Sequence, residues 1–253
     1  MTNDLQKAGL WKRTAAWMFD SILTVILAVG LGVVLSALLG YDGISARVDE
    51  AYARYESAYG VAFEITQEEF DAMTDAQRET YDAAYEALIG DEQAMADYNL
   101  MLNLTLVIIS LAILLAVLIL ELAVPLYFGN GQTLGKKIFG LAVMRVDSVK
   151  MNHMQLFART ILGRYTIDIM IPVYAALMLF WGALNIYVTL LLLVLTLVQV
   201  LLPLLNRMGC CLHDLLAGTV VVDYGSQMIF RTSEDLIAYQ KKQAADRAAR
   251  QPY

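Results

Sequence analysis

The chain has 253 residues, of which 58% are hydrophobic and 17% are charged, and its net charge is −7. Soluble domains carry about 25% charged residues and disordered chains are poor in hydrophobic ones, so this composition excludes both and favours a membrane protein. Two adjacent cysteines, Cys210 and Cys211, exclude a small disulfide-bonded fold.

The negative charge is concentrated in one segment. Residues 41–98 contain 15 of the 25 acidic residues and 3 of the 18 basic ones, which gives this segment −12 and the rest of the chain +5. No basic stripe with interleaved aromatic residues occurs in the sequence, so nucleic acid is not an expected partner.

The first membrane-spanning helix is predicted at about residues 14–40, because Ser21–Tyr41 contains no charged residue and a helix needs about 20 apolar residues to cross the bilayer. Asp20 lies inside this helix, two turns after Arg13. A charge at mid-bilayer costs about 2.5–3.5 kcal/mol on insertion scales, so we expect Asp20 to face protein or water, with Arg13 beneath it at the cytoplasmic interface. Two interpretations stay open: a structural contact between helices, or a carboxylate that binds a cation or proton.

Small or polar residues recur at four-residue steps along this helix. They are Asp20, Thr24, Ala28, Gly32, Ser36 and Gly40. Small residues at this spacing let helix backbones approach closely. The pattern predicts packing against a second helix, either of the same chain or of a second copy in a homo-oligomer.

The acidic segment 41–98 is predicted to fold into short helices. Thr66–Glu69 and Thr74–Gln77 each fit a capping box, in which two side chains satisfy the first backbone N–H groups of a helix. Two interpretations remain: a solvated helical hairpin, or a cap that binds a cation or a partner.

The second spanning helix is predicted at about 99–127, from the uncharged run Asn99–Leu120. Glu121 follows near its inner end. This acid either lines the same interior as Asp20 or lies at the level of the lipid headgroups.

A basic loop is predicted over 129–155. Its Lys136 and Lys137 are expected to contact anionic lipid headgroups. Val143–Val146 is predicted to form a short strand that pairs with Val220–Val222 in a cytoplasmic hairpin-like cover.

The uncharged run Ile169–Asn206 has 38 residues, enough for two short helices at about 166–182 and 186–205. Gly182–Asn185 is the expected turn between them.

Asp168 follows Arg164 by four residues, so the two side chains share one helix face. They form either a structural pair or part of a cation site. Arg159 is expected to point elsewhere, toward the headgroups.

After the fourth helix, Asp214 is expected to cap a short helix that ends at Gly218. It is also expected to pair with an arginine at the inner surface, Arg13 or Arg207, and we favour Arg13. The alternative makes His213 and Asp214 part of a proton or cation path.

Cys210, Cys211 and His213 are weak candidates for a metal site. Adjacent thiols do not easily occupy neighbouring tetrahedral positions, and a fourth ligand is missing. We therefore predict no metal and no other cofactor.

Lysine and arginine residues precede the first helix, separate the second from the third, and follow the fourth, which predicts that both termini are cytoplasmic. The expected fold is an all-α membrane protein with four transmembrane helices and an acidic helical insert outside the cytoplasm. Its parts are the N-terminus with the first helix (1–40), the insert (41–98), helices two to four (99–206), and a cytoplasmic His-Asp segment with a C-terminal helix (207–253).

Three segments of the sequence resemble segments of RDD-family membrane proteins, which are named for one Arg and two Asp. They are Trp11–Asp20; Gly131–Leu141, similar to Gly-x-Thr-x-Gly-Lys-x-x-x-Gly-Leu; and, after Arg207, His213–Val221. The resemblance implies that Arg13, Asp20 and Asp214 are that triad and that the protein transports ions or small solutes. The long acidic insert and the cysteine pair depart from the family pattern.

Two functions from different classes fit these observations. The first is a carrier in a prokaryotic plasma membrane that exchanges a monovalent cation for protons. Asp20 would be its central carboxylate, Arg13 and Asp214 would gate the cytoplasmic side, and Glu121, Arg164 and Asp168 would support them. Four helices are few for a complete carrier, so we expect a homo-oligomer in the lipid bilayer.

The second function is a scaffold or accessory subunit whose buried charges are structural. The carrier requires Asp20 to be near water, whereas the scaffold requires it to be dry and paired. The sequence has no nucleophile elbow, zinc motif or phosphate loop, so an enzyme is not predicted.

Overall fold

The computed structural model describes residues 8–180, 186–206 and 209–250. The chain is mostly helical, and four of its helical segments are long and apolar enough to cross a membrane. These segments are Leu10–Leu38, Glu92–Phe128, His153–Leu179 and Ile186–Leu205. The four predicted spans are therefore found, and the expected turn at Gly182–Asn185 lies outside the described residues.

The first three spanning helices begin earlier in the chain than predicted. Each start was predicted just after a charged residue, on the assumption that this residue lies outside the helix. The third helix begins at His153, thirteen residues before its predicted start at 166, and continues through Arg159, Arg164 and Asp168. These charges do not end the helix because their side chains are buried against partners of opposite charge. The sequence alone does not reveal such pairing.

The chain divides into two compact units. The first comprises residues 1–28 and 113–253, and the second comprises residues 29–112. Two helices contribute to both units: α1 (Leu10–Leu38) and α5 (Glu92–Val117).

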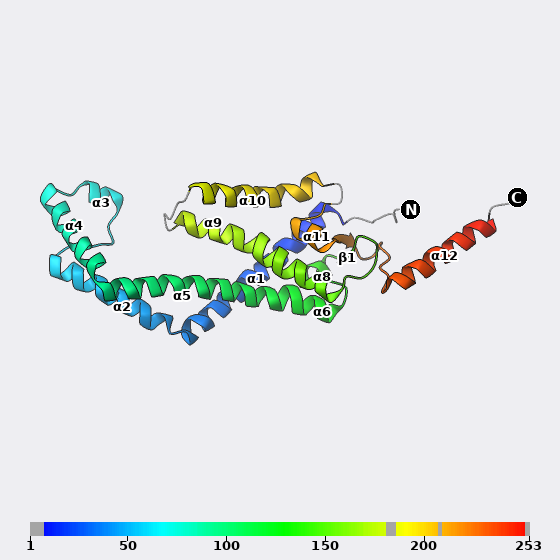
Figure 1. Ribbon diagram of the computed structural model, residues 1–253, viewed down its shortest axis with the longest axis horizontal. Helices are drawn as coiled ribbons and strands as arrows, with labels where there is room; N and C mark the ends of the chain where they lie inside the picture. The colour runs from blue at the N-terminus through cyan, green and yellow to red at the C-terminus, as the bar shows by residue number, and fades with distance from the viewer. Residues whose placement is uncertain (1–7, 181–185, 207–208, 251–253) are drawn as a thin grey trace. The chain divides into compact units, whose positions relative to one another are not determined.

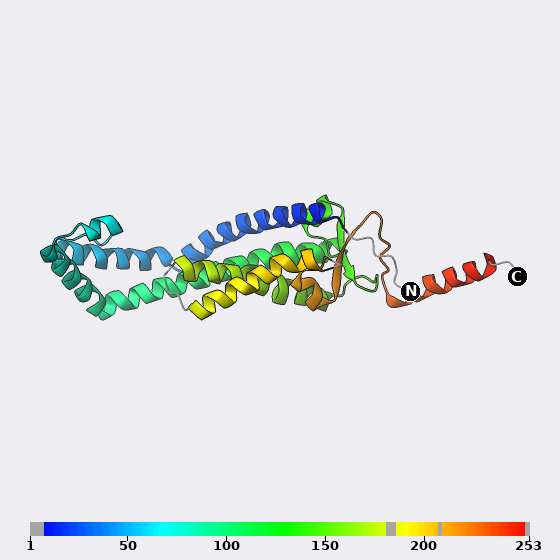
Figure 2. The same cartoon turned by 90° about the horizontal axis from the view of Figure 1, so that it is seen from above.

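The first unit contains α1 up to residue 28, α5 from residue 113, and eleven further elements among the described residues. In chain order these are η1 (Leu118–Ala123), α6 (Val124–Phe128), α7 (Leu134–Ile138), β1 (Leu141–Arg145), α8 (His153–Ala158), η2 (Arg159–Met170), α9 (Ile171–Phe180), α10 (Ile186–Leu205), α11 (Leu212–Ala217), β2 (Thr219–Asp223) and α12 (Ser233–Arg250). Figures 1 and 2 show the short elements α7, β1, α11 and β2 at the end of this unit where α1 begins and α6 ends. This end also contains the candidate site.

Strands β1 and β2 form the predicted antiparallel pair, with Leu141 opposite Asp223 and Arg145 opposite Thr219. Met144 and Val220 pack on one face with Cys210, while Val143 packs on the other face with residues of α1 and α8. Because both faces are buried, the strands are apolar almost throughout and show only weak alternation.

Two segments of the first unit, η1 and η2, are π-helices, which the sequence did not predict. A π-helix shifts backbone hydrogen bonds from i→i−4 to i→i−5, and such segments are frequent at functional sites. Here the carbonyl of Glu121 in η1 accepts a hydrogen bond of 3.0 Å from the Thr160 hydroxyl in η2. The two π-helices carry four of the charged residues of the site.

The second unit holds the acidic segment. Its helices are α2 (Tyr41–Tyr59), α3 (Gln67–Asp71) and α4 (Asp75–Gly90), together with the parts of α1 and α5 within residues 29–112. Both predicted capping boxes are present, at Thr66 with Glu69 and at Thr74 with Gln77. A small core of Ala51, Leu88 and Ala94 packs against Tyr52, Tyr55 and Phe63.

The predicted packing stripe on α1 is correct only in part. Ala28, Gly32 and Ser36 are half-buried, and a Cβ on Gly32 would lie 3.9 Å from the Cβ of Ala112 in α5. Gly40 is exposed and has a positive φ of 68°, so it forms the turn between α1 and α2. The prediction for Gly40 is wrong because this glycine ends the helix and so cannot extend the stripe.

Candidate functional site

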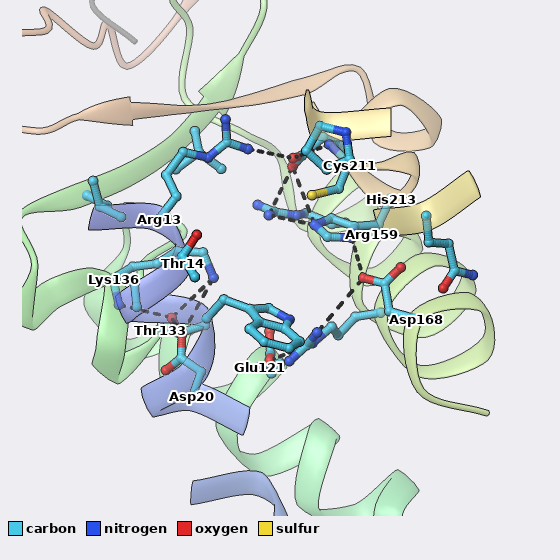
Figure 3. Close-up of a pocket in the computed structure, with 18 of the residues that line it drawn as sticks. Arg13, Thr14, Asp20, Glu121, Thr133, Lys136, Arg159, Asp168, Cys211 and His213 are labelled. Carbon is cyan, nitrogen blue, oxygen red and sulfur yellow. Dashed lines mark hydrogen bonds and ion pairs between the residues drawn. The ribbon is translucent and has the colours of Figure 1, made fainter. Parts of the chain in front are cut away.

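A cavity of about 580 Å³ lies in the first unit, between α1, η1, α7, η2, α10 and α11. The ionisable residues that line it include Arg13, Asp20, Glu121, Lys136, Arg159, Arg164, Asp168, His213 and Asp214. All seven residues predicted for the buried-charge network are among them. Figure 3 shows Asp20, Thr133 and Lys136 on one side of the cavity and Asp168 with His213 on the other.

Asp20 is held by the loop that follows the second span. Its Oδ2 accepts a hydrogen bond of 2.5 Å from the Thr133 hydroxyl, and its Oδ1 accepts one of 2.7 Å from the backbone N–H of Gly135. The Nζ of Lys136 lies 3.8 Å from Oδ2. Both oxygens of this buried carboxylate therefore have donors from one short segment.

Gly135 is required here by a close approach between backbones. A Cβ at this position would lie 2.5 Å from the carbonyl oxygen of Ala16 and 2.9 Å from Oδ1 of Asp20. Gly135 belongs to the RDD-like loop segment, and the structure shows that a glycine is needed there because of the contact with α1.

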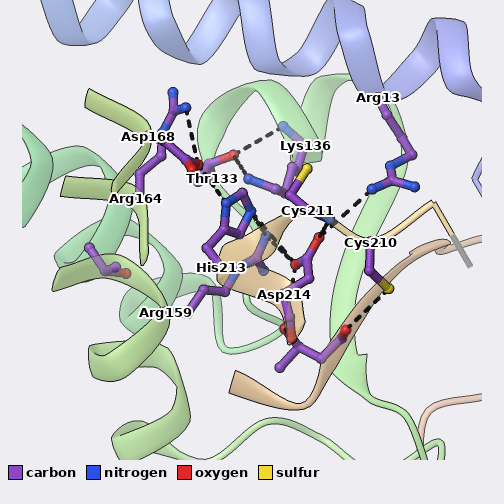
Figure 4. A network of polar contacts seen from close by, with 12 residues as sticks. Arg13, Thr133, Lys136, Arg159, Arg164, Asp168, Cys210, Cys211, His213 and Asp214 are labelled. Atoms are coloured by element: carbon purple, nitrogen blue, oxygen red, sulfur yellow. Dashed lines mark hydrogen bonds and ion pairs between the residues drawn. The ribbon is translucent and has the colours of Figure 1, made fainter. Parts of the chain in front are cut away.

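Asp214 is the centre of a second cluster and has no exposed surface. Its Oδ1 lies 2.9 Å from Nη2 of Arg159, and its Oδ2 lies 3.8 Å from Nη2 of Arg13. Figure 4 shows the two arginines on opposite sides of this carboxylate. The favoured contact with Arg13 is present, while Arg207 lies outside the described residues.

The capping role of Asp214 differs in detail from the prediction. The N-cap of α11 is Cys211, and Asp214 occupies the third helical position, from which Oδ2 accepts a hydrogen bond of 3.2 Å from the Cys211 N–H. Gly218 ends the helix in the left-handed conformation, as predicted. Asp214 thus stabilises the start of its own helix from within it.

His213 connects Asp214 to the third helix. Its Nε2 lies 3.2 Å from Nη2 of Arg159, and its Nδ1 lies 2.5 Å from Oδ2 of Asp168. Because a guanidinium can only donate, Nε2 accepts and Nδ1 donates to Asp168, which assigns the neutral tautomer. The approach is close, since a Cβ on Gly163 in η2 would collide with the side chain of His213.

A third group joins the second and third spans. The Nε of Arg164 donates a hydrogen bond of 3.0 Å to Oε1 of Glu121, and Nη2 donates one of 3.0 Å to the Ser21 hydroxyl. Arg164 Nη1 lies 3.9 Å from Asp168, which confirms the predicted contact at four-residue spacing. Glu121 is buried, so of the two predicted positions it occupies the interior one.

Three sequence-based expectations about partners are wrong. Arg13 contacts Asp214, and Asp20 contacts the α7 segment, so these two residues are not a pair in the structure. Arg159 is 8% exposed and faces the cavity, not the headgroups. Lys136 likewise lines the cavity with its side chain 16% exposed, because Asp20 is there to neutralise it. Lys137 is exposed beside the Phe128 ring, so the predicted lipid contact remains a prediction for this lysine alone.

Burial and neighbouring charges shift the pKa of groups in this region. Burial alone would raise the pKa of Asp214, but the charge of Arg159 and the hydrogen bond from the Cys211 N–H more than offset it, so the pKa lies below its usual value. Burial lowers the pKa of Lys136. Burial also raises the pKa of Cys211 to about 11, so its thiol is protonated at neutral pH.

Cys211, His213 and Asp214 bring three ligand atoms within 4.8 Å of one another. Their chemistry does not favour a metal ion. The Cys211 thiol resists deprotonation, and His213 and Asp214 already contact the guanidinium of Arg159, whose positive charge would repel a cation.

A comparison with protein-family models matches residues 7–218 to the RDD family. The chain belongs to the RDD family. Comparisons with curated proteins and with solved structures found no match. The RDD match covers every residue that lines the cavity except Val221. It ends before β2 and α12. With four membrane-length helices, this RDD-family chain has the architecture of a multi-pass membrane protein.

Proposed function

We propose that this RDD-family protein is a carrier, and not an enzyme, that moves ions or small solutes across a prokaryotic plasma membrane. The cavity of about 580 Å³ carries the proposal, since small-molecule sites commonly measure about 300–1,000 Å³. Ionisable residues within membrane segments commonly line solute paths. Both termini are proposed to be cytoplasmic, and the protein is proposed to act as a homo-oligomer.

The contacts of the acids suggest separate roles within this carrier. Asp20 is 5% exposed and has hydrogen-bond donors on both oxygens, so it fits a structural fastening between α1 and α7 better than the central carboxylate of a cation exchanger. Asp168 and His213 share one hydrogen bond at the cavity wall. We assign the exchange of protons to this pair, because histidine commonly acts as a proton shuttle and Asp168 holds its ring at the cavity wall.

A non-transporting scaffold is the second candidate, and one observation favours it. Each acid of the cavity contacts a base or a hydrogen-bond donor, so the charge network is balanced without any solute. The scaffold requires Asp20 to be dry and paired, and its hydrogen bonds with Thr133 and Gly135 meet the second condition.

Flux in proteoliposomes separates the two candidates. The native protein is reconstituted, and movement of Na⁺, K⁺ and phosphate under an imposed pH gradient is compared with empty liposomes. The carrier predicts flux in at least one case and a loss of about tenfold or more in Asp168→Asn, because that variant cannot take up a proton. Asp223→Asn is the matched control, since Asp223 pairs with Lys12 outside the cavity.

Native flux no higher than that of empty liposomes for all three probes would reject a carrier of these ions and support the scaffold. Equal loss in Asp168→Asn and Asp223→Asn, with both variants folded, would reject the role of Asp168.

A further inference from the structure

The acids and the arginines that line the cavity differ in how many hydrogen bonds their side chains make. Asp20 and Asp214 each have donors on both carboxylate oxygens. By contrast, the side chain of Arg13 makes no hydrogen bond to the described residues, and its nearest acid, Asp214, is 3.8 Å away. Arg159 is more than nine-tenths buried and directs only Nη2 toward partners in the described part of the chain.

Among these four residues, the groups that make no hydrogen bond to the described residues are therefore mainly N–H donors of the two arginines. A guanidinium offers five N–H groups in a planar fork that suits the oxygens of a phosphate or carboxylate. Arg13 and Arg159 reach the same carboxylate from opposite sides (Figure 4), and both residues line the cavity. Such a region suits an anion better than a metal cation.

Part of the cavity lining is apolar and exposed. It includes Trp17, Val200 and Leu204, which are 54%, 62% and 59% exposed, respectively. These residues belong to α1 and α10, two of the membrane-length helices, so their exposed surfaces meet acyl chains in a bilayer. The lining thus combines buried charged side chains with apolar side chains that are exposed on membrane-length helices.

We propose that the solute of this carrier is an amphiphile with an anionic phosphate headgroup, an inference that rests on the transport function proposed above. Arg13 and Arg159 bind the headgroup, and the acyl chain lies along Trp17, Val200 and Leu204. The fixed charges of the lining are balanced, with four acids and four Lys or Arg residues, so a bound anion meets no excess of negative charge.

Binding is measured by quenching of Trp17 fluorescence. Trp11→Phe and Trp181→Phe leave Trp17 as the only tryptophan, and the protein in detergent micelles is titrated with phosphatidic acid that carries dibrominated chains. We expect saturable quenching that unlabelled phosphatidic acid reverses. Dibrominated diacylglycerol, which lacks the phosphate, is expected to quench only in proportion to its mole fraction.

Arg13→Lys and Arg159→Lys keep the positive charge next to Asp214 but lose the planar fork. Each variant is expected to raise the apparent Kd for phosphatidic acid about tenfold, as expected for a lost charge-assisted hydrogen bond. Arg145→Lys is the matched control, because Arg145 pairs with Asp147 away from the cavity lining and should leave the Kd unchanged.

Three outcomes would overturn the inference. Equal quenching by diacylglycerol would reject the anionic headgroup, and displacement by inorganic phosphate at the same concentration as the lipid would show a free-anion site. An unchanged Kd in both arginine variants would reject their role. The lipid comparisons use native arginines, so they stay decisive if a variant fails to fold.

The two proposals can fail independently. Saturable lipid binding, with neither flux of the three ions nor transfer of phosphatidic acid between the leaflets of the proteoliposomes, would reject the carrier and keep the lipid site. Flux of Na⁺, K⁺ or phosphate without saturable lipid binding would reject the lipid site and keep the carrier.

Discussion

Asp214 has no exposed surface, and its carboxylate contacts two arginines, one histidine and one backbone N–H group. Removing one partner of a buried ion pair leaves the other charge without compensation, which costs about 3–5 kcal/mol. The buried partner left behind here would be Arg159. Asp214 is thus expected to matter for folding as much as for any function.

We predict that Asp214→Asn lowers the free energy of unfolding by about 3–5 kcal/mol. Unfolding in detergent micelles, followed by circular dichroism against denaturant, measures the change. Asp223→Asn serves as control because Asp223 pairs with the exposed side chain of Lys12, and it should leave stability almost unchanged. Similar losses in the two variants would show that burial of the Asp214 pair has no special weight.

The thiol of Cys211 gives a second prediction at the residue scale. Its pKa is raised to about 11 by burial, and only the thiolate reacts with alkylating reagents. We expect iodoacetamide at pH 8 to modify Cys211 in the folded protein on the order of 100-fold more slowly than in the unfolded chain, since two pKa units change the thiolate fraction by that factor.

Cys210→Ala leaves Cys211 as the only thiol for this measurement. The rate is followed by mass spectrometry between pH 7 and pH 11. Because the folded thiol holds its proton more tightly, the rate should still rise above pH 9. A plateau already reached near pH 9 would contradict the prediction.

At the scale of elements, α7 is attached to α1 through Gly135. The space for a side chain is absent there, because Ala16 and Asp20 lie within 3 Å of a Cβ at this position. The contact joins the loop after the second span to the first helix. Any displacement of α7 would also remove both hydrogen bonds to Asp20.

We predict that Gly135→Ala destabilises the protein by about 1–3 kcal/mol, as overpacking of a filled site does. Gly30→Ala, in the exposed face of α1 with nothing within 4 Å of its Cβ, should be neutral or stabilise by about 0.5–1 kcal/mol. Thermal unfolding of both variants in the same detergent tests the difference. If Gly135→Ala unfolds at the same temperature as the native protein, α7 can move away from α1 without loss of stability.

Local patterns predicted many of these elements. Uncharged runs located the four spans, capping boxes located α3 and α4, and a weak alternation over Val143–Val146 located the first strand of the β1–β2 pair. Such features depend on residues close in sequence, so a reading of the chain can find them. The seven charged residues predicted for the network also line one cavity.

Apart from the contact of Arg13 with Asp214 and the pairing of β1 with β2, partners distant in sequence were not predicted correctly. The spacing between Arg13 and Asp20 suggested a pair, yet the donors to Asp20 are 113 and 115 residues away. Periodicity shows that a polar residue faces protein, but it does not show which of several opposite charges it meets. The π-helices η1 and η2 were missed for the same reason, since tertiary contacts hold their freed carbonyls.

At the scale of the whole molecule, the uneven distribution of lysine and arginine predicts the orientation in the membrane. Residues 41–98 contain 3 of the 18 lysine and arginine residues, and the rest of the chain contains the other 15. Lysine and arginine near the ends of spans favour the cytoplasmic side. The acidic segment is therefore expected outside the cytoplasm and the C-terminal helix α12 inside it, on opposite sides of the membrane.

We predict that an impermeant maleimide labels Ser57→Cys on intact cells and labels Ala248→Cys only after permeabilisation. Both positions are exposed in the structure, one in α2 and one in α12, so access is limited only by the membrane. The native protein, with Cys210 buried and Cys211 half-buried, gives the background. Labelling of Ala248→Cys on intact cells would reverse the orientation or reject an even number of crossings.

The attachment of Asp20 to Thr133 and Gly135 also bears on biogenesis. When a ribosome has made the first helix, the residues that receive this acid do not yet exist, and at 5–20 residues per second they follow after about ten seconds. During that delay the nascent helix carries an acid without its final donors, at a cost in lipid of about 2.5–3.5 kcal/mol. That penalty favours retention of the new helix beside the translocon, or at the water interface, until the loop has been synthesised.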